Sequence, residues 1–295
     1  MKPTSQADYT KRIERVIAAV AASLEQEQPL PSTATLAGIA NFSPFHFMRV
    51  YRALAGESLG ATVQRLRLTR AAHLLACGAA PVAEIAGSVG FETPQAFARA
   101  FRQQFGIAPS EARAMDLASE TRAVALHALA QPPPAIRVDV VTLRPFRVVV
   151  LRNQGAYAKL DEAFGRLYAW MAARGALESI SGIWGVPHHD GRDTPEVDCL
   201  FDCCLASPAE LIAGDGVMPG DIGGGDYLRH LHVGSYERLE ETHDVLFREL
   251  FARPELRLRE TTVLHEYLND PEATPEDALQ THVYLPVERA TETPS

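Results

Sequence analysis

Hydrophobic residues in the first part of the chain recur at the spacing of an amphipathic helix. Phe47, Val50, Tyr51 and Leu54 stand at positions i, i+3, i+4 and i+7, which places all four on one helical face. A second apolar stripe runs through residues 58–77 without a proline and predicts one continuous helix. The first part of the chain is therefore predicted to be all-α.

Three consecutive prolines, Pro132–Pro134, end the helical pattern. Proline cannot continue a helix and favours an extended spacer. After them, the segments 147–151 and 281–285 are rich in β-branched residues, which predicts strands. The boundaries predicted from this change are a helical domain at 8–115, a linker at 116–136 and an α+β domain at 137–289.

An internal repeat in the helical part indicates a duplicated supersecondary unit. Phe47 and Gly56 recur as Phe97 and Gly106, within matching surroundings. Each copy is predicted to form two short helices around a tight turn, which is a helix-turn-helix, and the segment 58–77 joins the two copies. 

Two turn signals support this prediction. Ser32 is placed to cap the first helix of the first copy, because a serine oxygen can accept a free backbone N–H at a helix start. Asn41 stands where the turn needs a positive φ, and its counterpart in the second copy is Gly90.

The second helix of each copy carries candidates for reading DNA, since this helix enters the major groove in a helix-turn-helix protein. The residues opposite the core are Phe45, Met48, Arg49 and Arg52 in the first copy, and Gln95, Arg99 and Arg102 in the second. Arginine suits guanine edges and phosphates, and glutamine suits adenine. The alternative from the pattern alone is an ordinary helical bundle with solvated arginines.

The helix that joins the copies has the right length for a double reader. It would span ~30 Å, close to the ~34 Å between successive major-groove segments on one side of DNA. One chain is therefore expected to contact two adjacent segments of double-stranded DNA.

Charge is distributed unevenly between the two parts. The chain has a net charge of −9. Residues 1–115 carry 12 Lys/Arg and 8 Asp/Glu, a net +4, whereas residues 116–295 carry 16 and 29, a net −13. A basic helical part suits binding to phosphates, and the acidic part is not expected to be a second DNA reader.

The α+β part has its own repeat. Gly155-x-Tyr157-x-x-Leu160-x-Glu162 recurs as Gly234-x-Tyr236-x-x-Leu239-x-Glu241. Each copy is predicted to form a strand, a glycine turn, a helix and two further strands. The predicted fold is one α+β domain of two pseudo-symmetric β-α-β-β units.

Glu266 is the main candidate residue for ligand binding. On a regular strand it shares a face with Leu264 and Leu268, where an unpaired carboxylate is costly. A cationic ligand would pair with it, and aromatic neighbours such as Trp184, Tyr157 or Tyr236 would add cation–π attraction. The alternative is that this face is solvated and Glu266 is an ordinary strand residue.

Other kinds of site find little support in the sequence. The four cysteines form no CxxC pair, no set of three or four metal ligands is apparent, and Gly223–Gly225 lacks the Lys of a phosphate loop. No Ser-His-Asp or Cys-His arrangement is evident. No apolar run reaches the ~20 residues of a membrane span, and the start of the chain has no secretory pattern. We expect a cytoplasmic protein that is not an enzyme and has no metal, cofactor or membrane partner.

The helical domain resembles the AraC/XylS family. The matching stretches are 36–56 and 85–109, within a resemblance that covers roughly 9–115. It implies base contacts from Phe45, Met48, Arg49, Pro94, Gln95, Ala98 and Arg99. Met48 and Ala98 differ from the polar residues that some members carry, so the resemblance does not identify the operator.

The α+β domain resembles the gyrase-inhibitor-like effector-binding domain of multidrug-sensing regulators. The matching segments are 183–186, 225–237 and 266–271. This resemblance implies a pocket between the two repeats, with Glu266 as counter-charge and Trp184 as wall.

Together these features predict a sequence-specific transcription regulator whose C-terminal domain binds a small effector, for which a lipophilic cation is one candidate. Two alternatives stay open for that domain. In the first alternative, the domain is a hydrolase with an acidic residue as base. In the second, it docks a protein such as gyrase or RNA polymerase.

Overall fold

The computed structural model describes residues 6–78, 80–113 and 136–290, and for Gln6 and Phe45 only the backbone. The chain divides by its contacts into two compact units. The first, here called the sheet unit, contains residues 1–9, 48–53 and 132–295; the second, the helical unit, contains residues 10–47 and 54–131. The predicted linker at 116–136 lies outside the described residues, except for Ile136.

Helices occupy the described residues before 114, as predicted. They are α1 (Gln6–Glu25), α2 (Thr33–Ala40), α3 (Pro44–Ala55), α4 (Leu59–Cys77), α5 (Val82–Ser88), α6 (Pro94–Phe105) and α7 (Pro109–Ala112). The pairs α2–α3 and α5–α6 are the two predicted helix-turn-helix copies, and α4 is the predicted joining helix. Among the described residues, no helix has the length and apolar composition to cross a membrane.

The predicted turn signals are confirmed. The Ser32 side chain accepts the Thr35 N–H at the start of α2. Asn41 has a φ of 53° and Gly90 a φ of 86°, so both turns pass through the left-handed region. Asparagine and glycine adopt this region at the lowest cost, which explains why these residues occupy equivalent positions of the repeat.

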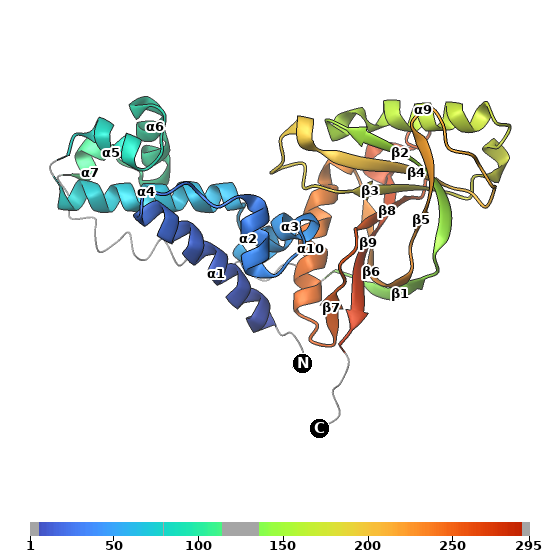
Figure 1. Ribbon diagram of the computed structural model, residues 1–295, viewed down its shortest axis with the longest axis horizontal. Helices are drawn as coiled ribbons and strands as arrows, with labels where there is room; N and C mark the ends of the chain where they lie inside the picture. Colours follow the sequence, from blue (N-terminus) through green and yellow to red (C-terminus); the bar gives the residue numbers. More distant parts are fainter. Residues whose placement is uncertain (1–5, 79, 114–135, 291–295) are drawn as a thin grey trace, which may run out of the picture. The chain divides into compact units, whose positions relative to one another are not determined.

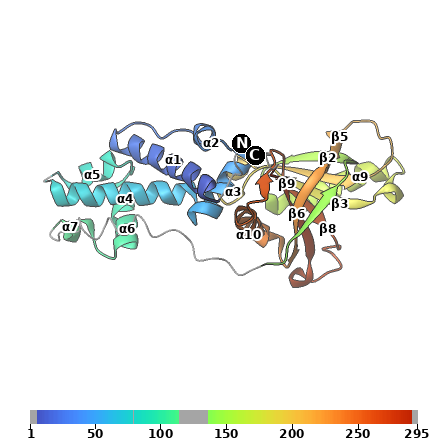
Figure 2. The ribbon, with the colours of Figure 1, turned by 90° about the horizontal axis from the view of Figure 1, so that it is seen from below.

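The second helix-turn-helix packs at one end of α4. Figure 2 shows α5, α6 and α7 gathered around that end. Phe97 and Phe101 of α6 are fully buried there, with ring centroids 5.5 Å apart. They pack with Leu68 and Leu75 of α4 and Ile85 of α5. This core fixes which face of α6 points outward.

The arginines of α4 are engaged within the protein. Arg65 pairs with Glu57 at 2.6 Å, and Arg70 pairs with Glu27 at 2.9 Å. Arg67 donates to the Gly90 carbonyl oxygen at 3.2 Å. These side chains therefore hold the helices of the fold together in this structure.

The sheet unit contains the predicted pair of β-α-β-β repeats. The first repeat is β2 (Phe146–Gln154), α9 (Leu160–Ala172), β3 (Gly182–Pro187) and β4 (Leu200–Ala206). The second is β6 (Gly225–Val233), α10 (Leu239–Phe251), β8 (Leu264–Tyr267) and β9 (Gln280–Arg289). The remaining strands are β1 (Asp139–Leu143), β5 (Val217–Ile222) and β7 (Leu256–Leu258). The predicted fold class is thereby confirmed.

All strands join one antiparallel sheet in the order β1-β6-β9-β8-β3-β4-β2-β5, with β7 paired to β9. The two repeats meet where β3 pairs with β8, and there Trp184 lies opposite Glu266. The equivalent strands of the repeats are arranged symmetrically on either side of this junction. The centre of the sheet is therefore built equally from both repeats.

The two faces of the sheet have different neighbours. Helix α9 packs on β2 and β4, and α10 packs on β6, β7 and β9 (Figure 1). Leu151 and Leu205 belong to the core beneath α9. The opposite face carries Trp184 and Tyr284, together with Phe146. We call these the helix face and the aromatic face.

Candidate functional site

The outward face of α6 carries the DNA-reading candidates of the second helix-turn-helix. Thr93 caps this helix by accepting the Ala96 N–H at 3.2 Å, so the helix begins at Pro94. Because Phe97 and Phe101 point inward, the side chains that project from the opposite face are Pro94, Gln95, Arg99 and Arg102, which are exposed, and Ala98, which is half-buried.

Arg99 and Arg102 are available for binding. Within the described residues neither guanidinium makes an ion pair, and both sit on a helix anchored by a buried aromatic core. An arginine in this setting can form bidentate hydrogen bonds with a guanine edge or a phosphate. Gln95, one turn before Arg99, can do the same with adenine.

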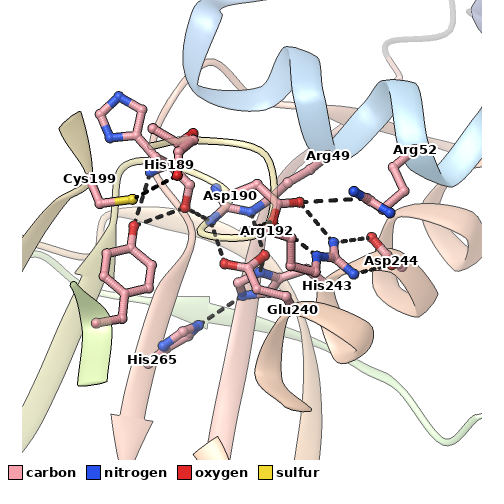
Figure 3. Close-up of polar contacts among 12 residues, drawn as sticks. Arg49, Arg52, His189, Asp190, Arg192, Cys199, Glu240, His243, Asp244 and His265 are labelled. Atoms are coloured by element: carbon pink, nitrogen blue, oxygen red, sulfur yellow. Dashed lines mark hydrogen bonds and ion pairs between the residues drawn. The ribbon is translucent and has the colours of Figure 1, made fainter. Parts of the chain in front are cut away.

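In the first helix-turn-helix, the arginine equivalent to Arg99 is buried rather than exposed. Residues 48–53 of α3 belong to the sheet unit, and Arg49 is only 1% exposed. Its Nε donates to Glu240 Oε2 at 3.2 Å and its Nη2 donates to Glu240 Oε1 at 3.0 Å (Figure 3). The same Nη2 also donates to the His189 carbonyl oxygen. Sequence reasoning placed Arg49 on the outward face of α3, whereas the structure buries it against carboxylate and carbonyl oxygens.

Arg52, one turn further along α3, is also engaged. Its Nη2 lies 2.6 and 2.7 Å from the two carboxylate oxygens of Asp193. Asp190, which is buried, lies 3.9 Å from the Arg52 Nε and forms a 2.8 Å pair with Arg192, which in turn pairs with Asp244 of α10. Met48 is half-buried, and the side chain of Phe45 lies outside the description.

A chain of hydrogen bonds continues from Glu240 into the sheet. His243 Nδ1 lies 2.9 Å from Glu240 Oε2, and His243 Nε2 lies 2.8 Å from His265 Nε2. A carboxylate can only accept, so His243 Nδ1 donates to it. Between the two Nε2 atoms, one nitrogen donates and the other accepts. The chain thus links Arg49 of α3 to His265 of β8 through two side chains of α10 (Figure 3).

Burial and charge shape the ionisation of this network. Burial opposes the charge of Arg49, but the adjacent Glu240 carboxylate outweighs it and raises the pKa of Arg49. Burial also opposes the charge of Glu240, but Arg49 and His243 outweigh it and hold the Glu240 pKa well below its usual value. For His265, burial and then His243 lower the pKa, which keeps this imidazole neutral at pH 7. The Arg49–Glu240 pair is therefore ionised at neutral pH.

Glu266 lies on the aromatic face of the sheet. Its Oε2 accepts the Tyr284 hydroxyl at 2.6 Å and lies 3.0 Å from His282 Nδ1. The Trp184 ring stands 5.5 Å from the Tyr284 ring and 4.9 Å from that of Phe146. The structure thus brings Glu266 and Trp184 together, as the sequence predicted.

This carboxylate retains access to solvent. The Glu266 side chain is 27% exposed, and among the described residues no lysine or arginine forms an ion pair with it. Two exposed hydrophobic side chains lie on the same face. Leu268 follows Glu266 by two residues, and Leu231 lies opposite His282 in the pairing of β6 with β9. An accessible carboxylate beside aromatic rings and exposed aliphatic groups is suited to a lipophilic cation.

Tyr157 and Tyr236 lie elsewhere. The Tyr157 hydroxyl donates to the carbonyl oxygens of His189 and Leu200, and its ring packs with Phe201 in the core beneath α9. The Tyr236 ring packs against Tyr267, 5.2 Å away. Tyr267 is next to Glu266 on β8, and adjacent residues of a strand point to opposite faces of the sheet. Tyr236, which packs on Tyr267, and Tyr157, which packs beneath α9, therefore both belong to the helix face. The expectation that these two tyrosines stand beside Glu266 is therefore wrong.

Two histidines of β6 have partners within the protein. His230 Nδ1 lies 2.8 Å from the Arg137 carbonyl oxygen, and His232 Nδ1 lies 2.8 Å from Thr242 Oγ1. In the described ranges, no group of three or more histidine, cysteine or acidic side chains is arranged to hold a metal ion.

Sequence reasoning missed the network around Glu240. Glu240 and His243 stand three residues apart on one helix, which is a weak signal that many solvated helices share. Asp190 and Asp193 lie in the connection between β3 and β4, where acidic residues are common. Only the tertiary structure brings these side chains to Arg49 and Arg52.

Two family models match the chain. Residues 137–288 match the model of the GyrI-like small molecule binding domain, and residues 36–115 match that of a helix-turn-helix domain. The "Probable transcriptional regulator YgiV" of Escherichia coli (strain K12) is 26% identical over 153 residues, which are 51% of this chain and 95% of that protein.

Two further similarities differ in extent. The "Right origin-binding protein" of Escherichia coli (strain K12) is 34% identical over 84 residues, which are 28% of this chain and 29% of that protein. The chain thus matches less than a third of the length of that relative. The crystal structure of a hydrolase from Listeria innocua covers 58% of this chain and 98% of its own, at 15% identity and a TM-score of 0.38, which is too distant to bear on activity. Through the model that matches more than half of its length, the chain belongs to the GyrI-like small molecule binding domain family, and it carries an AraC-type helix-turn-helix domain at residues 36–115.

Proposed function

We propose that this protein is a transcription regulator that reads double-stranded DNA with α6 and responds to a lipophilic cation bound at the Glu266 face. The observation that carries the DNA-binding part is the outward face of α6. Gln95 and Arg99 are exposed on a helix whose opposite face is locked by Phe97 and Phe101. Rigid support of this kind lets two side chains meet base edges in a fixed register.

The ligand-binding part rests on the chemistry of the aromatic face. Glu266 accepts hydrogen bonds from a phenol and lies against an imidazole, and it keeps a quarter of its side chain exposed. A cation would gain from the carboxylate and from the rings of Trp184 and Tyr284, while exposed Leu231 offers contact to an apolar substituent. Binding there would change the population of DNA-binding states if it favours one of them.

Selection from a library of random duplexes tests the DNA-binding part. The full chain should enrich a short motif, and the Arg99→Ala variant should lose preference at the base pairs that Arg99 reads while keeping part of its affinity through phosphates. If the wild-type chain enriched no motif from the library, the result would contradict sequence-specific binding. Enrichment of the same motif, to the same extent, by Arg99→Ala would remove α6 from the role of reader.

A further inference from the structure

The two reading helices differ in what their arginines contact. Arg99 of α6 is exposed, whereas Arg49, at the equivalent position of α3, is buried against Glu240. Arg52, which is half-buried, pairs with Asp193 through its Nη2. Both acidic partners lie in the α+β part of the chain, which the proposed function assigns to effector binding.

We propose that Glu240, with Asp193 as a second contact, forms an acidic binding surface that competes with DNA for the arginines of α3. This inference rests on the proposed function, since it assumes that α3 is a reading helix. In the held state, only the second helix-turn-helix is free to read bases. In the released state, Arg49 and Arg52 become available to a second segment of the same duplex.

The geometry makes the two partners mutually exclusive. Glu240 accepts from the Nε and Nη2 of Arg49, one of the two edges that a guanidinium offers for bidentate bonding to guanine or phosphate, and the side chain is only 2% exposed, so its other edge is also shielded. Nη2 also donates a hydrogen bond to the His189 carbonyl oxygen. A base or phosphate cannot reach this edge until Glu240 leaves it.

The held state depends on the charge of Glu240. The side chains of Arg49 and Glu240 are 2% and 13% exposed, so each charge has lost most of its contact with water. A buried ion that loses its partner is strongly unfavourable. Neutralising Glu240 should therefore drive Arg49 out to solvent, where DNA can bind it.

Glu240 is also held in position from the sheet side. His243 donates to the Oε2 that receives the Arg49 Nε, and His265 of β8 fixes the far nitrogen of His243. The carboxylate therefore presents a fixed orientation to Arg49, which favours specific pairing over a loose surface contact.

Labelling with phenylglyoxal, a reagent for accessible guanidinium groups, tests the held state directly in the full chain. In the wild type, mass spectrometry should find Arg99 modified and Arg49 protected. In Glu240→Gln, Arg49 should react at a rate closer to that of Arg99. The matched control is Glu241→Gln, the next residue of α10, whose carboxylate is 61% exposed and, among the residues that the structure describes, pairs with Arg238 on the surface. Both variants lose one negative charge from the same helix.

DNA binding supplies the second readout, with the duplex recovered in the selection experiment. Glu240→Gln should bind it at least about tenfold more tightly than Glu241→Gln, because release of α3 removes a competing state. Asp193→Asn, in a loop, is a milder variant that should move binding in the same direction. It keeps the test available if Glu240→Gln unfolds.

Each contrary outcome identifies what failed. Wild-type Arg49 that reacts as fast as Arg99, or an affinity of Glu240→Gln and Asp193→Asn equal to that of Glu241→Gln, would overturn the competition while the proposed function survives. Failure of every variant to bind DNA specifically would overturn the proposed function and the competition with it.

Discussion

His265 and Glu266 are consecutive residues of β8 whose side chains leave the sheet on opposite faces. Glu266 bonds Tyr284 on the aromatic face, and His265 lies 2.8 Å from His243 beneath α10. A ligand that displaces β8 at Glu266 would therefore also shift His265, the end of the hydrogen-bond chain that leads through His243 and Glu240 to Arg49. We propose this adjacency as the physical route between the ligand face and the arginine of α3.

The first prediction concerns this route. Adding the lipophilic cation tetraphenylphosphonium should increase the reaction of Arg49 with phenylglyoxal, because displacement of β8 weakens the bonds that orient Glu240. The reaction of Arg99 serves as an internal control and should not change. An increase that persists in Glu266→Gln would show that the effect does not pass through this carboxylate.

The second prediction concerns DNA reading. Arg99→Ala should weaken binding to the selected duplex by about 1–3 kcal/mol, because a bidentate arginine–guanine contact contributes about this much to the binding free energy. Fluorescence anisotropy at fixed salt measures the change. Arg166→Ala removes the same charge from an exposed position of α9 and should leave affinity nearly unchanged. Equal losses in the two variants would indicate only a general effect of charge.

The third prediction concerns the ligand face. At about 100 times its dissociation constant, a bound cation should stabilise the sheet unit by about 2.7 kcal/mol, seen as a rise in Tm. Glu266→Gln should lose most of this rise, because the amide keeps the shape of the site but removes its charge. Glu272→Gln, in an exposed turn, is the control and should respond as the wild type does. A full response from Glu266→Gln would remove this residue from the site.

The fourth prediction concerns pH. Burial, and then the neighbouring His243, lowers the pKa of His265, so below pH 6.5 the unfolded chain takes up a proton that the folded chain excludes. The free energy of unfolding of the sheet unit should therefore fall as pH drops from 7 to 5, by about 1–2 kcal/mol for this residue. The charged and titratable groups around it are His243 and Glu240 of α10, Arg49 of α3 and His232 of β6.

Tryptophan fluorescence measures this effect selectively, because both tryptophans of the chain, Trp170 and Trp184, lie in the sheet unit. His265→Gln keeps a donor toward His243 and removes the titrating group, so it should flatten the pH dependence. His73→Gln, on the exposed side of α4, should leave it unchanged. Burial also lowers the pKa of His232, which is another buried imidazole. An equal slope in wild type and His265→Gln would therefore contradict the assignment of the pH dependence to His265.

Much of this architecture could be predicted from sequence because its signals are local. The spacing of Phe47, Val50, Tyr51 and Leu54 defines a helix face, and Asn41 with Gly90 marks the turns. The repeated glycine and tyrosine positions revealed the duplicated sheet domain. The placement of Trp184 beside Glu266 came from the resemblance to the effector-binding domain, and in the structure both residues fall on strands that meet at the junction of the repeats.

The remaining features depend on contacts between distant parts of the chain. Tyr157 and Tyr236 follow their strands after a glycine turn, and only packing beneath the helices shows that they face away from Glu266. Arg49 and Arg99 are equivalent in the repeat, yet 191 residues separate Arg49 from the carboxylate that buries it. No local pattern distinguishes an arginine that meets solvent from one that meets such a partner.

Coupling between the Glu266 face and DNA binding is tested most directly by the affinity of the full chain for its selected duplex with and without tetraphenylphosphonium. The cation should change Kd by at least about fivefold, the lower end of ordinary coupling between two sites, and Glu266→Gln should abolish the change while still binding DNA. The same Kd at saturating cation, for a chain that thermal shift shows to be loaded, would contradict this coupling.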